Sequence, residues 1–157
     1  MNGWAVFSED RRYRYVLGRS WGAGDFLTFI GLNPSTADSQ QSDPTIRRCI
    51  GFAKLWGYSG LVMLNLFAFR ATDPREMRRE PDPIGPENDE AIVEATQRAP
   101  VIVLAWGAHG SHLGRDKEVL KLIHGGPAVS FGLTKLGQPK HPLYLSSASV
   151  AKVWDWQ

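Results

Sequence analysis

Four apolar runs of strand length, each followed by a turn and then by a helical pattern, constrain this chain most strongly. They span residues 26–30, 61–66, 101–104 and 128–131. Such alternation is typical of parallel strands that are joined by crossover helices. We therefore expect an α/β fold with a central, mostly parallel four-stranded sheet flanked by helices.

Capping signals place helices between these runs. An aspartate–proline pair at residues 43–44 supplies an N-cap and a first-turn proline for a helix that continues to residue 56. Pro86 opens a second helix, which continues to residue 97. A third helix begins at Ser111 or Asp116 and ends near residue 124, where two glycines follow.

The N-terminal segment has the pattern of a hairpin. Residues 4–7 are apolar, residues 13–17 are apolar or aromatic except for Arg14, and the intervening residues 8–12 are polar. This arrangement predicts two short strands joined by a turn. We expect an antiparallel hairpin at the edge of the fold.

The composition fits one ordinary globular domain. The chain has 157 residues, of which 43% are apolar and 22% are charged, and both its length and its composition are near the globular average. We therefore expect a single domain over residues 1–157. The net charge of +2 permits contact with a phosphate backbone but does not by itself predict it.

Several classes of protein are excluded by particular residues. Cys49 is the only cysteine, so the chain forms no intramolecular disulfide and holds no iron–sulfur cluster. The four histidines lack metal-binding partners at a convincing spacing, and we expect no metal or cofactor. The longest apolar runs are shorter than the roughly 18–20 residues of a membrane helix, and residues 1–14 do not resemble a secretory signal. We expect a cytoplasmic protein without a membrane partner.

Ligands of open parallel sheets bind beyond the carboxyl ends of the strands. The loops at these ends are residues 31–38, 65–70, 106–109 and 134–146. We therefore expect the chemistry of this protein in these four loops.

Four segments in these loops, taken in order, resemble the uracil-DNA glycosylase superfamily. Gly31-Leu32-Asn33-Pro34 resembles its water-activating loop. The closest likeness is to the mismatch-specific uracil and thymine glycosylases, which also carry asparagine before the proline, whereas the main uracil-excising family has aspartate there. The string at 31–38, Gly-Leu-Asn-Pro-Ser-Thr-Ala-Asp, is also similar to one in a family of uncharacterised bacterial and phage proteins.

The other three segments resemble the uracil-excising family. Residues 60–65 are similar to the strand that ends in its base-reading asparagine, here Asn65. Residues 101–109 are similar to its next strand, which finishes in Trp-Gly and a small residue before histidine. Residues 141–146 resemble its His-Pro-Ser loop, with Leu143 in place of the serine. The resemblance implies the fold of these enzymes and cleavage of an N-glycosidic bond.

The resemblance assigns catalytic roles to two residues. Asn33 would hold the attacking water through its side-chain carbonyl, and His141 would stabilise the departing base anion. Because an amide cannot accept a proton as a carboxylate does, we expect weak catalysis at a base that is already labile. Asp38 or Asp43, which flank the Asn33 loop, could supply the missing carboxylate. Without the other motifs, Asn33 would be interpreted as a turn residue.

Base recognition requires an amide and an aromatic ring. The amide of Asn65 can pair with the adjacent donor and acceptor of a pyrimidine, or it can be satisfied by neighbouring backbone. Phe67 and Phe52 compete for the stacking role, and core packing is the alternative for both. Weaker candidates for contact with a nucleic-acid backbone are polar residues in or beside the loops, which can equally be solvated: Ser35, Arg47, Arg70, His109, Lys135, Lys140 and Ser146.

We therefore expect a DNA glycosylase-like hydrolase that extrudes a damaged, mismatched or modified base and cleaves its bond to deoxyribose. One alternative is an enzyme of the same fold that acts on a free nucleoside or nucleotide, because few residues follow Ser146 that could contact a duplex. A second alternative is a module that binds DNA or a modified base without cutting it. The expected partner is thus DNA, base-flipped or single-stranded, or a nucleoside or nucleotide.

Overall fold

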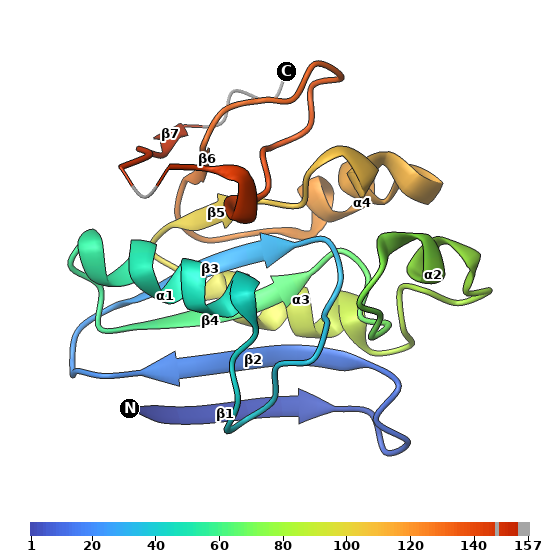
Figure 1. The fold of residues 1–157 in the computed structure, drawn as a ribbon, viewed down its shortest axis with the longest axis horizontal. Helices are drawn as coiled ribbons and strands as arrows, with labels where there is room; N and C mark the ends of the chain where they lie inside the picture. The colour runs from blue at the N-terminus through green and yellow to red at the C-terminus, as the bar shows by residue number, and fades with distance from the viewer. Residues whose placement is uncertain (147, 154–157) are drawn as a thin grey trace.

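The computed structural model describes residues 1–146 and 148–153, and in this part of the chain one seven-stranded sheet carries helices on both faces (Figure 1). The strand order is β1-β2-β4-β3-β5-β6-β7. The predicted domain, residues 1–157, includes residues 147 and 154–157, which lie outside the described residues. The strands are β1 (Asn2–Phe7), β2 (Arg14–Ser20), β3 (Phe26–Gly31), β4 (Gly60–Asn65), β5 (Ile102–Leu104), β6 (Ala128–Ser130) and β7 (Lys152–Val153).

The sheet is mixed. The four central strands, β4, β3, β5 and β6, pair in parallel, with Gly31 opposite Asn65 where β3 and β4 end. On one side β2 pairs antiparallel with β4, and β1 pairs antiparallel with β2. On the other side β7 pairs antiparallel with β6. All four parallel carboxyl ends therefore meet at the same edge of the sheet.

The α/β class, the flanking helices and the N-terminal hairpin are confirmed, but the predicted size of the sheet was wrong. The hairpin continues the sheet, because the backbone of β2 pairs with β4 in a register that sets Leu17 opposite Met63. Both side chains are buried in the same core cluster. A strand pattern shows which residues face a core but does not show which neighbour supplies the pairing backbone.

The helices follow the predicted order, with one addition. α1 (Pro44–Leu55) begins as expected, since Asp43 caps it by accepting a hydrogen bond from the backbone N–H of Ile46 at 2.9 Å. α2, of six residues, was not predicted. No helix among the described residues is long and apolar enough to cross a membrane. The remaining helices are α2 (Pro74–Arg79), α3 (Asn88–Gln97), α4 (Arg115–Leu122) and the 3-10 segments η1 (Ala108–Gly114) and η2 (Pro142–Tyr144).

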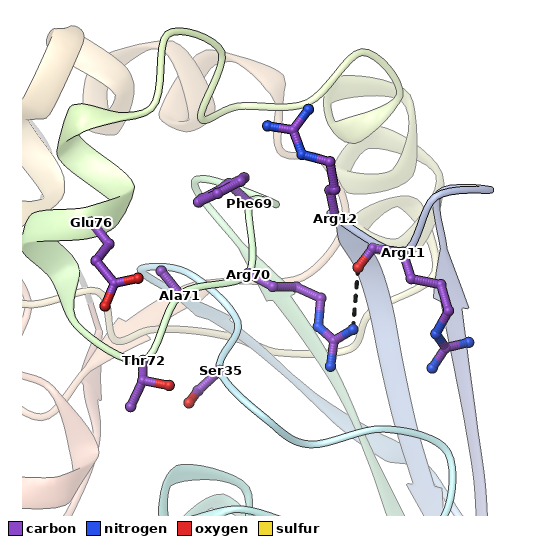
Figure 2. A pocket seen from close by; sticks show the side chains of 8 residues that line it. All are labelled: Arg11, Arg12, Ser35, Phe69, Arg70, Ala71, Thr72 and Glu76. Carbon is purple, nitrogen blue, oxygen red and sulfur yellow. Dashed lines mark hydrogen bonds between the residues drawn. The ribbon is translucent and has the colours of Figure 1, made fainter.

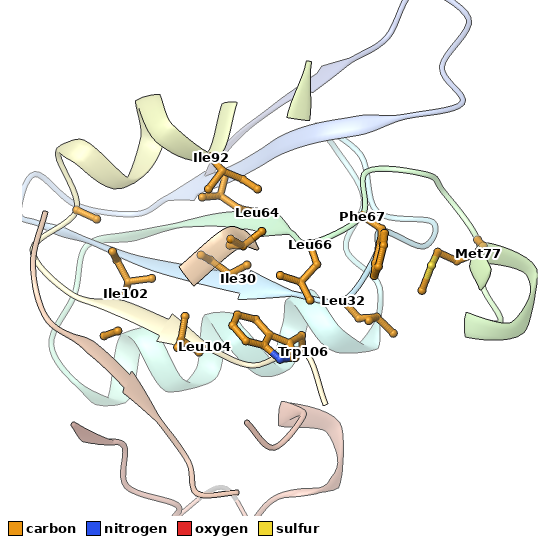
Figure 3. Packing of buried hydrophobic residues seen from close by; sticks show 14 residues of the cluster. Ile30, Leu32, Leu64, Leu66, Phe67, Met77, Ile92, Ile102, Leu104 and Trp106 are labelled. Carbon is orange, nitrogen blue, oxygen red and sulfur yellow. The ribbon is translucent and has the colours of Figure 1, made fainter. Parts of the chain in front are cut away.

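Alternate strand residues separate two buried layers, as the two-residue period of a strand requires. Leu27 and Phe29 of β3 pack in one layer with Phe52 of α1. Ile30 packs in the opposite layer with residues of α3 and α4, including Ile92 (Figure 3). These layers hold the central strands rigid, so that the loops at their carboxyl ends start from fixed positions.

Candidate functional site

A cavity of about 690 Å³ opens at the carboxyl ends of the parallel strands. This volume is within the range of small-molecule and cofactor sites, roughly 300–1,000 Å³. Residues from the loops after β3, β4, β5 and β6 line it, together with the start of α1. The cavity therefore lies at the four loops in which we expected the chemistry of this protein. Its lining includes five polar or ionisable side chains that matter below: Asn33, Asp43, His109, Lys140 and His141.

The amide of Asn33 is held in one orientation. Its Nδ2 donates hydrogen bonds to the carbonyl of Ala71 at 2.8 Å and to that of Pro34 at 3.1 Å. Because both partners are carbonyl oxygens, only the nitrogen of the amide can face them. The Oδ1 of Asn33 therefore lies on the other side of the group and acts as a hydrogen-bond acceptor.

Asp43 places a carboxylate in the lining of the same cavity. Its Oδ1 accepts the N–H of Ile46 at the start of α1, and its Oδ2 accepts the N–H of Ala37 at 3.3 Å. These bonds fix the carboxylate between α1 and the loop after β3. Asp38 does not line the cavity and instead accepts the backbone N–H groups of Gln40 and Gln41. Of the two carboxylates suggested by the sequence, Asp43 is the one beside Asn33 and His141.

His141 enters the cavity from the loop after β6. Burial, the largest influence, lowers the pKa of its imidazole, while the negative charge of Asp43 opposes this shift. The ring is therefore mainly neutral at pH 7. Its Nδ1 accepts the backbone N–H of Leu143 at 3.2 Å. The N–H of the neutral His141 ring is therefore at Nε2.

Two arginines of β2 hold the loop that carries Asn33 and Asp43. The guanidinium of Arg14 donates to the carbonyl of Ala37 at 3.0 Å. That of Arg19 donates to the carbonyls of Asp38 at 2.7 Å and of Gln41 at 2.9 Å. Both arginines are buried, and the loop is therefore tied to the hairpin side of the sheet.

A chain of three side chains holds the His141 loop. The indole N–H of Trp106 donates to Oε1 of Gln138 at 2.8 Å, and Nε2 of Gln138 donates to Asp116 of α4 at 3.0 Å. Next to Trp106, the backbone N–H of Gly107 donates to the carbonyl of Pro139 at 2.8 Å. These bonds join the end of β5 to the segment that leads into His141.

The structure brings together some of the predicted site residues and separates others. Ser35, His109 and Lys140 line the large cavity with Asn33 and His141. Asn65 does not line it; the residue is buried, and its Nδ2 has no hydrogen-bond partner in the described part of the chain. Its backbone carbonyl accepts Nδ2 of Asn88 at 3.0 Å.

The two phenylalanines proposed for stacking are core residues. Phe67 is fully buried with Trp106 and Met77, and its ring lies 5.6 Å from that of His112. Phe52 is buried between Trp56 and Phe131. Neither ring lines the cavity.

The remaining predicted backbone contacts lie outside the large cavity. Arg47 donates to the carbonyl of Ser42 at 2.8 Å. Lys135 and Ser146 are exposed on the loops after β6. Arg70 lines a second, smaller cavity.

This second cavity has a volume of about 330 Å³ and is lined by three arginines (Figure 2). Arg11 and Arg12 come from the tip of the β1–β2 hairpin, and Arg70 comes from the loop after β4. Ser35, Ala71 and Thr72 line both cavities. The sequence did not point to Arg11 and Arg12, because they lie in a polar turn far in sequence from the four loops.

Comparison with known proteins identifies the family. Residues 14–143 match the model of the family described as "Protein of unknown function (DUF1643)", and the chain belongs to this family. The match includes the string at 31–38. No curated protein and no solved structure gives a match. Among the residues that the structure describes, no group of three or more histidine, cysteine or acidic side chains is placed to hold a metal ion.

Proposed function

We propose that this protein hydrolyses an N-glycosidic bond, with the base of a damaged, mismatched or modified DNA nucleotide held in the large cavity. One observation carries the proposal: Asn33, Asp43 and His141, from different segments of the chain, line the same cavity. Together they offer a neutral acceptor, a carboxylate and a neutral N–H donor. These are the groups that such a hydrolysis needs.

His141 is suited to the leaving base. When the bond between C1′ and the base nitrogen breaks, its electron pair stays on the base, which leaves as an anion. An Nε2–H donor aimed at a base oxygen stabilises that charge. Burial favours the neutral imidazole. This neutral form supplies the N–H donor, so the ring does not have to lose a proton before the reaction.

Asn33 and Asp43 are suited to the water. Oδ1 of Asn33 accepts a hydrogen bond from the water and orients its oxygen toward C1′ of the sugar cation. As the new C–O bond forms, the water loses a proton, and the carboxylate of Asp43 accepts it. Asp43 thereby supplies the carboxylate that the loop sequence lacks at position 33.

The base itself is not read in the manner of the uracil-excising enzymes. That reading uses the asparagine at the end of β4, and here the side chain of Asn65 does not line the cavity. We therefore propose the class of bond that is cleaved and not a preference for uracil. In a duplex, the base has to be extruded before it enters the cavity.

The test is release of base from a panel of substrates. Single-stranded and duplex oligonucleotides carrying uracil, mismatched thymine or 5-modified pyrimidines are incubated with the protein, and abasic sites are revealed by alkaline cleavage. Free nucleotides are tested in parallel by chromatography of the released base. His141→Gln should abolish release, whereas His124→Gln, in a residue outside both cavities, should leave it unchanged.

The outcomes separate the alternatives. Release from oligonucleotides supports a DNA glycosylase, and release from nucleotides alone supports the small-substrate enzyme. Selective binding of a modified oligonucleotide without release supports a binding module. Folded protein that neither binds nor cleaves any member of the panel contradicts the proposal.

A further inference from the structure

We propose that the second cavity is a phosphate subsite, so that the substrate of the large cavity carries a phosphate group close to its base. This inference rests on the proposed function for the identity of the neighbouring ligand. The chemistry it names is a phosphate oxyanion, either the terminal phosphate of a nucleotide or a phosphodiester of a DNA strand.

Two of the three arginines are not neutralised by an ion pair. Arg12 is paired with Glu80 at 3.0 Å. Arg11 and Arg70 form no ion pair in the described part of the chain; their guanidinium carbons lie 4.0 and 4.8 Å from the centre of the Phe7 ring. An aromatic face attracts a cation but leaves its N–H donors for another partner.

Arg70 in particular keeps donor capacity. Its guanidinium donates to the carbonyl of Arg11 at 3.2 Å, as the dashed line in Figure 2 shows. Its Nε is buried and has no hydrogen-bond partner within the residues described. A guanidinium has five N–H donors, and in the described part of the chain this side chain makes one hydrogen bond, so its terminal N–H groups can bind an oxyanion.

The tip of the β1–β2 hairpin holds Arg11 in an unusual backbone conformation. This residue has a backbone φ of 60°, in the left-handed region that few residues other than glycine adopt. Ser8 and Asp10 brace the turn, since Ser8 donates to Asp10 at 2.7 Å and Asp10 accepts the N–H of Arg12. Strain of this kind persists where the surrounding structure demands it, and it is common at ligand sites.

Carboxylates oppose part of this charge. Glu76 of α2 lines the cavity, and the charge of Arg11 contributes to a lowered pKa of Asp38 after its backbone hydrogen bonds. Arg14, buried close enough for the charge of Arg70 to influence its pKa, adds a further cation. Among the residues that line the cavity, three arginines still outnumber the one carboxylate, Glu76, and the hydroxyl groups of Ser35 and Thr72 are additional donors.

The shared lining fixes the relation between the two cavities. Ser35, Ala71 and Thr72 face both, so a group in the second cavity lies directly beside a ligand in the first. This adjacency matches a nucleotide, in which a phosphate is joined through the sugar to the base. A nucleoside without phosphate would leave the arginines unused.

The experiment compares ligands that differ only in phosphate. The affinities for thymidine, thymidine 5′-monophosphate, inorganic phosphate and a single-stranded oligothymidylate are measured by titration, with the arginine Nε–H signals followed by NMR. Wild-type protein is compared with Arg11→Gln, Arg70→Gln and the control Arg98→Gln, which removes an exposed arginine outside both cavities. Circular dichroism verifies that each variant is folded.

We expect Arg70→Gln and Arg11→Gln each to weaken binding of the phosphorylated ligands by about tenfold or more, as loss of a charged hydrogen bond does. Thymidine binding and the control variant should not change. If the phosphate is that of a nucleotide, the monophosphate shows this loss. If it belongs to a strand, the oligonucleotide shows it, and the slope of log affinity against log salt falls by about one per arginine.

Equal affinity for ligands with and without phosphate would overturn the inference. An equal loss of affinity for the phosphorylated ligands in Arg11→Gln, Arg70→Gln and the control Arg98→Gln would overturn it too. These measurements concern binding alone. If the protein binds phosphate through Arg70 but releases no base, the phosphate subsite is supported and the proposed hydrolysis is contradicted. The failure of one proposal is thus distinguishable from that of the other.

Discussion

Asn33 donates a hydrogen bond from its side-chain nitrogen to the backbone carbonyl of Ala71, over a distance of 2.8 Å. This bond joins the loop after β3 to the loop after β4. It also gives a physical reason for an amide at this position. A carboxylate there would face two carbonyl oxygens and have no proton to offer them.

Asn33→Asp should therefore not improve catalysis. We expect the aspartate to lose both hydrogen bonds and to be repelled by the carbonyls of Pro34 and Ala71, which destabilises the fold by about 1–3 kcal/mol. The free energy of unfolding from urea denaturation measures the cost. Asn2→Asp, in an exposed residue of β1, is the control. A variant as stable as the wild type but more active would show that the amide is not held in this way.

The pH dependence should follow His141. Burial lowers the pKa of this imidazole in the folded chain, whereas the unfolded chain has the ordinary value of about 6.5. The unfolded chain therefore takes up the proton first as the pH falls. The stability that this group contributes is complete above about pH 6.5 and is lost as the pH falls through the lowered folded pKa.

Any base release should be affected in the same acidic range, because protonated His141 loses the Nδ1 acceptor that binds the Leu143 N–H. The imidazole proton signals in NMR give the pKa directly. His141→Gln should reduce the pH dependence of stability in this range, leaving the part due to His112, whose pKa burial also lowers, and His124→Gln should keep it. A folded-state pKa above 6.5 would contradict the assignment of a neutral donor.

Gln138 should be a positioning residue for the His141 loop. Gln138→Met leaves the buried N–H of Trp106 without its acceptor and Asp116 without its donor. We expect a loss of about 1–3 kcal/mol in the free energy of unfolding and broadened NMR signals of residues 139–143. Gln97→Met, in an exposed residue at the end of α3, is the matched control. Similar stability and sharp loop signals in both variants would refute this role.

Cys49 should report unfolding. It is fully buried in α1, and burial raises the pKa of its thiol. Since the thiolate is the reactive form, alkylating reagents should react only when the chain opens. The labelling rate should rise with urea in parallel with the loss of circular dichroism. Rapid labelling of the native protein would indicate that the layer beneath α1 is accessible.

The parallel strands and the capped start of α1 could be predicted because their signals are local. An apolar run, or Asp43 followed by Pro44, specifies its own structure through backbone and capping chemistry. The place of Asn65 and Phe67 could not be predicted in this way. Asn65 ends an apolar strand and Phe67 follows it, yet both are buried away from the cavity. Their surroundings come from distant residues, such as Asn88 at the Asn65 carbonyl and His112 beside the Phe67 ring.

The arginine cavity was hidden from the sequence for the same reason. Arg11 and Arg70 are separated by 59 positions. They meet because the chain before β2 pairs with the chain after β4, where the N–H of Arg70 donates to the carbonyl of Arg12 at 2.9 Å. The sequence pattern predicted the hairpin but not the strand to which it would attach. Residues brought together by sheet pairing are thus the part of the site that a single sequence reveals least.

Asp43→Asn offers the sharpest test of the carboxylate in the large cavity. Asparagine is as good an N-cap as aspartate, so the hydrogen bond to the Ile46 N–H and the start of α1 should persist. The longer bond from the Ala37 N–H, at 3.3 Å, loses its acceptor, which should lower the free energy of unfolding by about 1 kcal/mol. The negative charge is lost, and because the charge of Asp43 raises the pKa of His141 against the effect of burial, that pKa should fall further. If Asp43 accepts the proton of the attacking water, base release should fall by about 10²-fold or more. Asp38→Asn, which removes a charge outside the cavity, should alter neither the His141 pKa nor the release of base. An unchanged His141 pKa in Asp43→Asn would show that the two side chains do not share the site.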